Sequence, residues 1–264
     1  MTEEMKVAVF QPYLDKFETD EMRLYCADMI KRIPDYIFDI PSSTSGKYHN
    51  ATQCQDHGQV YHMIMFAEVL NYRLELKGNR EKFKSAVQRD AMRCTPFFHD
   101  AIKCGLNGGI YSVHDHPMLA GQWVRETKVE HDIDDKIKDV IARMCERHSG
   151  EYTTAAKNKV VLPEPENAME FFIHECDVLS SRKTIDMAPP EYLADIFNGN
   201  EVEASFDPET TFAFGKHKGE RMIDVYNKRP DYIAWCEENI HKRDFLNTIK
   251  AMKKYLEQDA DMGF

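Results

Sequence analysis

The sequence predicts a mainly α-helical protein with a small α+β domain at its C-terminal end. Apolar residues recur at helical spacing through most of the first 185 residues, and prolines and glycines occur mainly where that spacing stops. The pattern changes after Pro189-Pro190 and the acidic stretch 198–209. With 264 residues, the chain is long enough for one medium domain and one small domain.

Each expected element follows from this spacing. Before the change, the predicted helices span residues 17–38, 59–76, 81–103, 117–127, 134–148 and 167–183. Pro34 is expected to interrupt the first helix, whereas Pro117 suits the first turn of the fourth. After the change, residues 210–214 alternate weakly like a strand, and residues 221–257 have a helical pattern.

These elements divide the chain into four parts. We expect an N-terminal helical segment at 1–40, a main helical domain at 41–188, a linker at 189–208 and a small domain at 209–264.

Composition excludes several classes of protein. The net charge of -11 argues against a strong electrostatic grip on duplex DNA. No apolar run approaches the roughly 18 residues that span a bilayer, and the first residues lack the pattern of a signal peptide. The seven cysteines are widely spaced and form no CxxC, which disfavours a disulfide framework or a cysteine-rich zinc site. We therefore expect a cytoplasmic protein without a membrane partner; its oligomeric state stays open.

Histidines and aspartates fall on or beside apolar helix faces. His148 follows Met144 by four residues and Asp177 follows Ile173 by four, so each shares a buried face. An aspartate on such a face is costly unless it is paired or binds a cation, and helical bundles build metal sites from side chains of several helices. The sequence therefore predicts a shared metal site at six positions: His62, His99, Asp100, His116, His148 and Asp177.

Several segments resemble, in order, the motifs of the HD superfamily of metal-dependent phosphohydrolases. They are FFHDAIKCG (97–105), HDHPMLAG (114–121), ERHSG (146–150) and LPEPENAMEFFIHECDVLSSRK (162–183). SGKYHNATQCQDHGQVYHM (45–63) resembles a variant found in some bacterial and phage HD proteins and in HD-type 3′-to-5′ exoribonucleases. The resemblance implies an HD-type helical bundle over about residues 40–185.

The resemblance also implies a set of roles. The six residues would hold one or two divalent ions, namely Mn, Fe, Co, Ni, Zn or Mg, with Asp100 between the ions if there are two. Asp100 and Lys103 would be catalytic, with Lys103 as a cation on the phosphoryl oxygens while an activated water attacks phosphorus. Lys47, His49 and Arg182 would bind substrate.

Some assignments stay open among the histidines. His57 replaces a motif glycine and rivals His62 as the first ligand. His114 could replace His116, although the His116-Pro117 junction matches the motif. His174, three residues before Asp177, is expected to support the ligands from behind. The remaining candidates are expected at the surface: His131, His217 and His241.

The segment FAFGKHKGERMIDVYNKRPDYIAWCEENI (212–240) resembles a short module that trails some DNA-processing exonucleases. Its Gly215–Gly219 turn presents Lys216 and Lys218, which we expect to contact nucleic acid. Tyr232 and Trp235 lie three residues apart on a predicted helix, where they could stack on a base or pack; packing in the small core is favoured for Trp235.

Together these features predict a phosphohydrolase that acts on a nucleotide or a single-stranded nucleic acid. The alternatives are an HD-type di-iron oxygenase and a non-catalytic nucleic-acid-binding protein with a vestigial HD domain.

Overall fold

The computed structural model describes residues 1–43, 46–47, 49–109, 111–155, 158–185, 187–198, 206–240 and 243–261. The chain divides into two compact units, Met1–Pro190 and Glu191–Phe264. The described residues are mainly helical, as predicted, and their β structure is limited to an isolated antiparallel bridge between Thr211 and Arg221.

The first unit holds eight α-helices and two short 3-10 helices within its described residues. The α-helices are α1 (Glu3–Leu14), α2 (Asp20–Lys31), α3 (Gly58–Glu75), α4 (Lys77–Lys82), α5 (Ala86–Phe98), α6 (His116–Glu126), α7 (Asp135–Glu146) and α8 (Ala168–Ser181); the 3-10 helices are η1 (Asp35–Phe38) and η2 (Thr52–Cys54). Pro34 separates α2 from η1, as its missing N–H leads us to expect.

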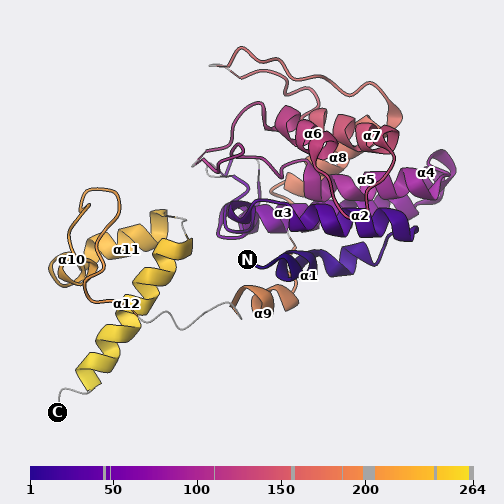
Figure 1. Cartoon of the computed structure of the whole chain (residues 1–264). Coiled ribbons are helices and arrows are strands. Elements are labelled where there is room, and N and C mark those ends of the chain that lie inside the picture. The colour runs from indigo at the N-terminus through magenta and orange to yellow at the C-terminus, as the bar shows by residue number, and fades with distance from the viewer. Residues whose placement is uncertain are drawn as a thin grey trace. The chain divides into compact units, whose positions relative to one another are not determined.

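Helix α3 lies at the centre of this unit. It packs against α5 on one side and α8 on another, while α7 packs against α5, α6 and α8 (Figure 1). Most of the α3 side chains from Val60 to Leu70 are buried, so this helix is apolar around much of its circumference. Residues placed inward on α3, α5, α6, α7 and α8 can therefore meet.

Two glycines permit close approaches that the site requires. A Cβ on Gly58, the first residue of α3, would lie 2.3 Å from the Gln53 carbonyl oxygen. Gly150 has a φ of 59°, and a Cβ there would lie 2.1 Å from the His174 ring. A side chain at either position would displace the chain beside His62 or His148.

The second unit contains α9 (Tyr192–Asn198), α10 (Met222–Lys228), α11 (Pro230–Asn239) and α12 (Arg243–Asp261). Its core is formed by Phe206, Phe212, Met222, Val225, Ile233, Cys236, Ile249 and Met252. Helix α9 occupies part of the predicted linker. The helix predicted over 221–257 is instead divided among three helices: Pro230 begins α11 directly after Arg229, and α11 ends at Asn239 before α12 begins at Arg243.

The α+β description of this unit is not met by its described residues. The segment 210–214 makes the Thr211–Arg221 bridge but no strand. Arg221 directly precedes α10, so the chain turns into a helix before a second strand can form opposite Thr211.

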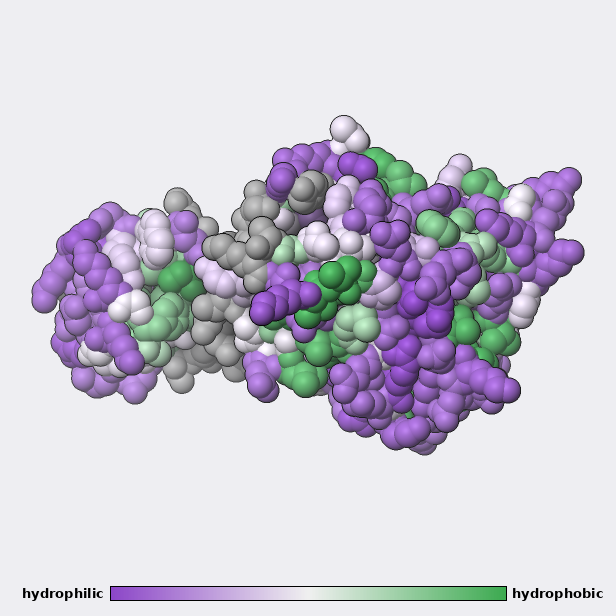
Figure 2. All heavy atoms as spheres, turned by 90° about the horizontal axis from the view of Figure 1, so that it is seen from above, coloured by the Kyte–Doolittle hydropathy of each residue, from purple (hydrophilic) through white to green (hydrophobic). Residues whose placement is uncertain are grey.

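The surface is largely hydrophilic on the face drawn in Figure 2. Across the described chain, none of the helices combines the length and the apolar character needed to cross a bilayer.

A charged cluster connects the start of α2 to α5. The Glu18 carboxylate accepts hydrogen bonds from Arg80, Arg89 and Arg93. Asp90, fully buried on α5, accepts from the backbone N–H groups of Glu18 and Thr19. The cluster therefore fixes the entry of the chain into α2.

We expect Glu18→Gln to destabilise the protein in a pH-dependent way. Hydrogen bonding to Arg89 lowers the pKa of Glu18 to about 2 although burial opposes the shift. A lowered folded-state pKa contributes stability that is complete above the ordinary value of 4.5 and is lost as the pH falls through about 2. The variant should lose about 2 kcal/mol at pH 7, and its difference from wild type should shrink between pH 5 and pH 2. Urea unfolding across this pH range measures it, with the exposed Glu21→Gln as control; a difference independent of pH would contradict the assignment.

Candidate metal centre

The six predicted ligands lie together inside the first unit. They are contributed by five helices or the turns beside them: His62 on α3, His99 and Asp100 directly after α5, His116 at the start of α6, His148 just after α7, and Asp177 on α8. This arrangement is how helical bundles assemble metal sites.

The polar atoms converge on two overlapping groups that share His99. In the first, His62 Nε2 lies 3.2 Å from His99 Nε2 and 3.1 Å from Asp177 Oδ1. In the second, His99 Nε2 lies 3.4 Å from Asp100 Oδ2, and His148 Nε2 lies 3.9 Å from Asp100 Oδ1. Within each group, the candidate ligand atoms lie within 4.8 Å of one another. His116 adds an Nε2 atom 2.9 Å from Asp100 Oδ1.

Burial shows where this cluster opens. The His99 side chain has no exposed area, and those of His62, Asp100 and His148 are nearly as buried. The side chains of His116 and Asp177 are each 16% exposed. The cluster is therefore least covered at His116 and Asp177.

Three histidines are oriented by the same local hydrogen bond. The Nδ1 atoms of His99, His116 and His148 lie 3.0, 2.7 and 2.7 Å from the carbonyl oxygen of the residue three positions earlier. A carbonyl oxygen only accepts, so each Nδ1 carries the hydrogen. In the neutral ring Nε2 then presents its lone pair to the cluster, which is the form that binds a metal.

The surroundings of these groups set their charges. Burial, together with the charge of His99, lowers the pKa of His148 to about 3, and burial likewise lowers that of His62. Burial opposes ionisation of Asp100, but the charges of Lys103 and His99 hold its pKa well below the ordinary value. Hydrogen bonding with His62 similarly lowers the pKa of Asp177 against the effect of burial. The centre thus combines two carboxylates with the neutral imidazoles of His62 and His148. Burial opposes a charge on His99, but the charges of Asp100 and Asp177 raise its pKa above the ordinary value.

The cluster fits a divalent transition metal. Asp100 Oδ1 and His62 Nδ1 are buried without a hydrogen-bond partner. A buried carboxylate oxygen that faces imidazole nitrogens without a donor is unfavourable in a dry interior, and a cation beside Asp100 Oδ1 would remove that penalty. Four imidazoles and two carboxylates suit Mn, Fe, Co, Ni or Zn, whereas Mg prefers oxygen ligands alone.

A second layer of side chains holds Asp100. Lys103 Nζ lies 2.7 Å from Asp100 Oδ2, 2.9 Å from Gln59 Oε1 and 3.4 Å from Ser42 Oγ. The Gln59 amide also donates to Asp100 Oδ2 at 3.1 Å. Lys103 is only 7% exposed, so it is no solvated surface lysine.

Sequence reasoning missed Gln59 and Ser42. Gln59 lies three residues before His62 and so shares its helix face, a signal that could have identified it. Ser42 belongs to a loop, where periodicity offers no comparable signal.

The structure separates the rival histidines. His57 caps α3 with a φ of 60°, and its Nδ1 donates to the Phe38 carbonyl. His114 Nε2 lies 3.1 Å from the Val160 carbonyl. Among the described residues, the candidate ligand groups contain His62 but not His57, and Asp100 is met by His116.

His174 lies behind the cluster, where sequence reasoning expects it. Its Nδ1 donates to the His148 carbonyl at 2.7 Å, and its Nε2 pairs with Glu151. His131 is 45% exposed, consistent with its surface prediction, and His241 lies outside the described residues.

The predicted substrate residues differ in position. The His49 ring meets the His62 ring edge-on with centroids 5.1 Å apart, and its Nδ1 donates to Gln53 Oε1. Burial, with the charge of His62, lowers the pKa of His49 to about 4, so His49 is uncharged at neutral pH. Lys47 and Arg182 are both exposed, and their roles stay predictions.

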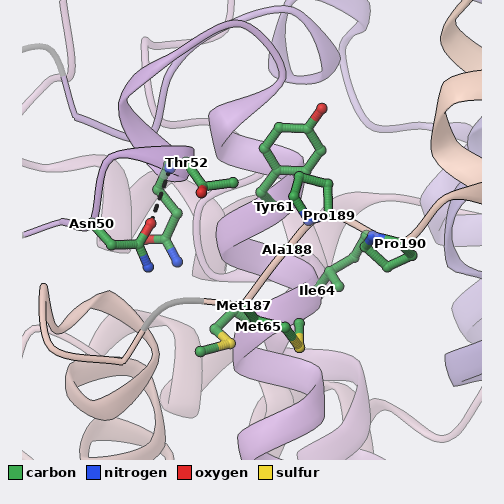
Figure 3. A pocket seen from close by; sticks show the side chains of 10 residues that line it. Asn50, Thr52, Tyr61, Ile64, Met65, Met187, Ala188, Pro189 and Pro190 are labelled. Carbon is green, nitrogen blue, oxygen red and sulfur yellow. Dashed lines mark hydrogen bonds between the residues drawn. The ribbon is translucent and has the colours of Figure 1, made fainter.

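Gln53 also borders a small hollow beside α3. Figure 3 shows the residues that line it, which include Asn50, Thr52 and Tyr61 and the segment Met187–Pro190. Gln53 thereby connects the wall of this hollow to His49 and, through the ring contact, to His62.

In the second unit, Lys216 and Lys218 are exposed in the turn after Phe214. The prediction that Trp235 packs in the small core is wrong: its side chain is 50% exposed, and the core forms without it. The surface prediction for His217 is also wrong, since its side chain is only 13% exposed against Phe212 and Tyr232.

We expect a divalent metal to stabilise the protein through His99, because both ligand groups use this residue. At 100 times the dissociation constant, binding to the folded state contributes about 2.7 kcal/mol, so Mn²⁺ or Ni²⁺ should raise Tm by about 5 °C or more. His99→Ala should abolish the shift, while His131→Ala should retain it. Equal shifts in the two variants, measured by scanning calorimetry, would place the metal elsewhere.

Gln59→Leu should lower metal affinity by about 10- to 100-fold, because Asp100 and Lys103 lose a common partner. Titration calorimetry with Mn²⁺ measures the change, and circular dichroism checks the fold. The exposed Gln122→Leu serves as control. An unchanged affinity in Gln59→Leu would show that Lys103 alone positions the carboxylate.

Comparison with known proteins identifies a family for one short segment. Residues 212–241 match the family model described as exodeoxyribonuclease X-like C-terminal, which confirms the resemblance of the C-terminal module. No HD-domain family model matches the chain. No curated protein and no solved structure matches it either.

Proposed function

We propose that the protein is an HD-type metal-dependent phosphohydrolase that cleaves a phosphoester or phosphoanhydride bond in a nucleotide or a single-stranded nucleic acid. One observation carries this proposal: imidazole Nε2 atoms and carboxylate oxygens gather in two buried groups that share His99, and Asp100 Oδ1, which faces His116 and His148, has no hydrogen-bond donor. The motif order seen in the sequence supports it.

The reaction is a displacement at phosphorus. A bound divalent ion would supply hydroxide at neutral pH and neutralise charge on the phosphoryl oxygens. The oxygen of one water forms a bond to phosphorus, the bond to the leaving oxygen breaks, and the leaving oxygen gains a proton. The products are a phosphate or phosphomonoester and an alcohol or a second phosphate.

The chain contributes position and charge. Asp100 keeps its negative charge in a buried site because Lys103 donates to Oδ2, which leaves Oδ1 facing His116 and His148. The partial exposure of His116 and Asp177 makes their side of the cluster the approach for a substrate. The neutral His49 beside His62 is a candidate to bind that substrate.

The role inferred for Lys103 changes with this geometry. Its ammonium has three N–H groups, and Asp100, Gln59 and Ser42 supply three acceptors. We therefore assign Lys103 to positioning Asp100 rather than to direct contact with a phosphoryl oxygen.

A nucleic-acid substrate is supported by the exonuclease-like module. The exposed Lys216 and Lys218 of that module suit phosphate contacts. The net charge of -11 favours local recognition over a broad electrostatic surface.

The activity test is a panel of nucleoside monophosphates, dinucleoside polyphosphates, cyclic nucleotides and single-stranded RNA and DNA, assayed with Mn, Fe, Co, Ni, Zn and Mg. We expect metal-dependent release of phosphate or nucleotide, reduced at least about 100-fold in Asp100→Asn. His114→Ala is the matched control, because it removes an imidazole two residues from His116 but outside the cluster.

Two results would overturn the proposal. Metal-loaded protein that is inactive across the whole panel would favour a non-catalytic HD fold. Oxygen consumption with a paramagnetic iron signal and no hydrolysis would favour the di-iron oxygenase.

A further inference from the structure

The Gly215–Gly219 turn is built as a projecting loop of the second unit. Gly215 and Gly219 have φ values of 80° and 87°, a backbone conformation that favours glycine. The Gly219 N–H donates to the Phe212 carbonyl at 2.8 Å, which closes the turn on the small core. Lys216 and Lys218 lie between the glycines and are both exposed.

An aromatic pair lies directly against this turn. A Cβ on Gly215 would lie 3.0 Å from the Tyr232 hydroxyl, and the His217 ring meets the Tyr232 ring edge-on with centroids 4.5 Å apart. Tyr232 in turn stacks on Trp235, with ring centroids 5.9 Å apart and planes inclined by 19°. The lysine turn and the indole ring therefore belong to one rigid surface.

The Trp235 side chain is exposed and does not contribute to the core of the second unit. On α11, Ile233 and Cys236 are buried in the core, whereas Trp235 is 50% exposed. A large aromatic ring fixed by stacking, with half its area open to solvent, is a preformed platform for another flat ring.

The charges around the platform favour an anion at the lysines. Arg221 pairs with Glu209 and Asp224, and Arg229 pairs with Asp231. Among the side chains that the structure describes in this unit, no carboxylate pairs with Lys216 or Lys218. The two lysines thus keep their charge available beside the aromatic pair.

We propose that Tyr232 and Trp235 form a stacking platform for an unpaired nucleobase of a single-stranded nucleic acid, while Lys216 and Lys218 bind its backbone phosphates. This deepens the proposed function by naming where the module would hold such a substrate. A duplex hides its base faces, and two lysines alone provide a weak grip on it. The geometry therefore selects an unpaired strand.

Binding of a labelled 12-nucleotide single strand to the full chain, by fluorescence anisotropy without divalent metal, tests the proposal. Trp235→Ala should weaken binding about tenfold, and Trp235→Phe should retain most of it. Tyr72→Ala, which removes a 72% exposed aromatic ring from the first unit, should bind as wild type.

The lysines have a charge-matched control. Lys216→Gln/Lys218→Gln should weaken binding and reduce the slope of log K against log salt by about 1.4, the contribution of two phosphate contacts on a single strand. Lys84→Gln/Lys136→Gln makes the same charge change at exposed positions of the first unit and should leave the slope unchanged.

Intrinsic tryptophan fluorescence tests the platform in a variant that leaves Tyr232 and Trp235 unchanged. In Trp123→Phe, Trp235 is the remaining tryptophan, and its emission should be quenched by the single strand but not by a duplex of the same sequence. Wild-type affinity in Trp235→Ala, or equal quenching by the duplex, would overturn the proposal. Because this measurement needs no turnover, failure of the platform and failure of the hydrolase are separate results.

Discussion

The buried carboxylate of Asp100 is the constraint on which the first unit depends. A carboxylate removed from water is stable only where an opposite charge balances it and hydrogen-bond donors or a cation contact its oxygens. Lys103 and Gln59 meet Oδ2, whereas Oδ1 faces His116 and His148. Helices α5, α6 and α7 must therefore approach at one point, and Gly150 with its positive φ allows the chain after His148 to pass the His174 ring. The same requirement governs the packing and the chemistry.

The orientation of the histidines is decided locally. His99, His116 and His148 each use the carbonyl three residues earlier, a bond available wherever a chain turns at a helix end. Because the partner is local, the tautomer and the direction of each ring depend on its own turn and not on a side chain of another helix. Only the distances between rings then depend on the tertiary structure, and these bring His99 and His148 to a centroid separation of 4.8 Å. Such preorganisation limits the rearrangement that a ligand would require.

Helical periodicity makes His62, His148 and Asp177 predictable, because it assigns each to a buried face. His99, Asp100 and His116 lie beside such faces and were predicted together with them from the order of the HD-like motifs. The side chains that hold Asp100 are harder to predict. Lys103 belongs to the HD-like motif, but one of its three acceptors is Ser42 from a distant loop, and no local sequence pattern indicates that contact. Trp235 was misplaced because apolar character predicts burial, while its helix already fills the core with Ile233 and Cys236. The break at Pro230 was visible in the sequence and was overridden by the helical pattern on either side.

The two units differ in the charged groups that an anion such as a phosphate would meet. In the first unit, the buried carboxylates of Asp100 and Asp177 repel a phosphate unless a bound cation offsets their charge. In the second unit, the arginines near the turn are already paired with carboxylates, so attraction comes from two lysines alone. Recognition there must draw on a contact that charge does not supply, and the exposed indole face of Trp235 beside Tyr232 is such a contact.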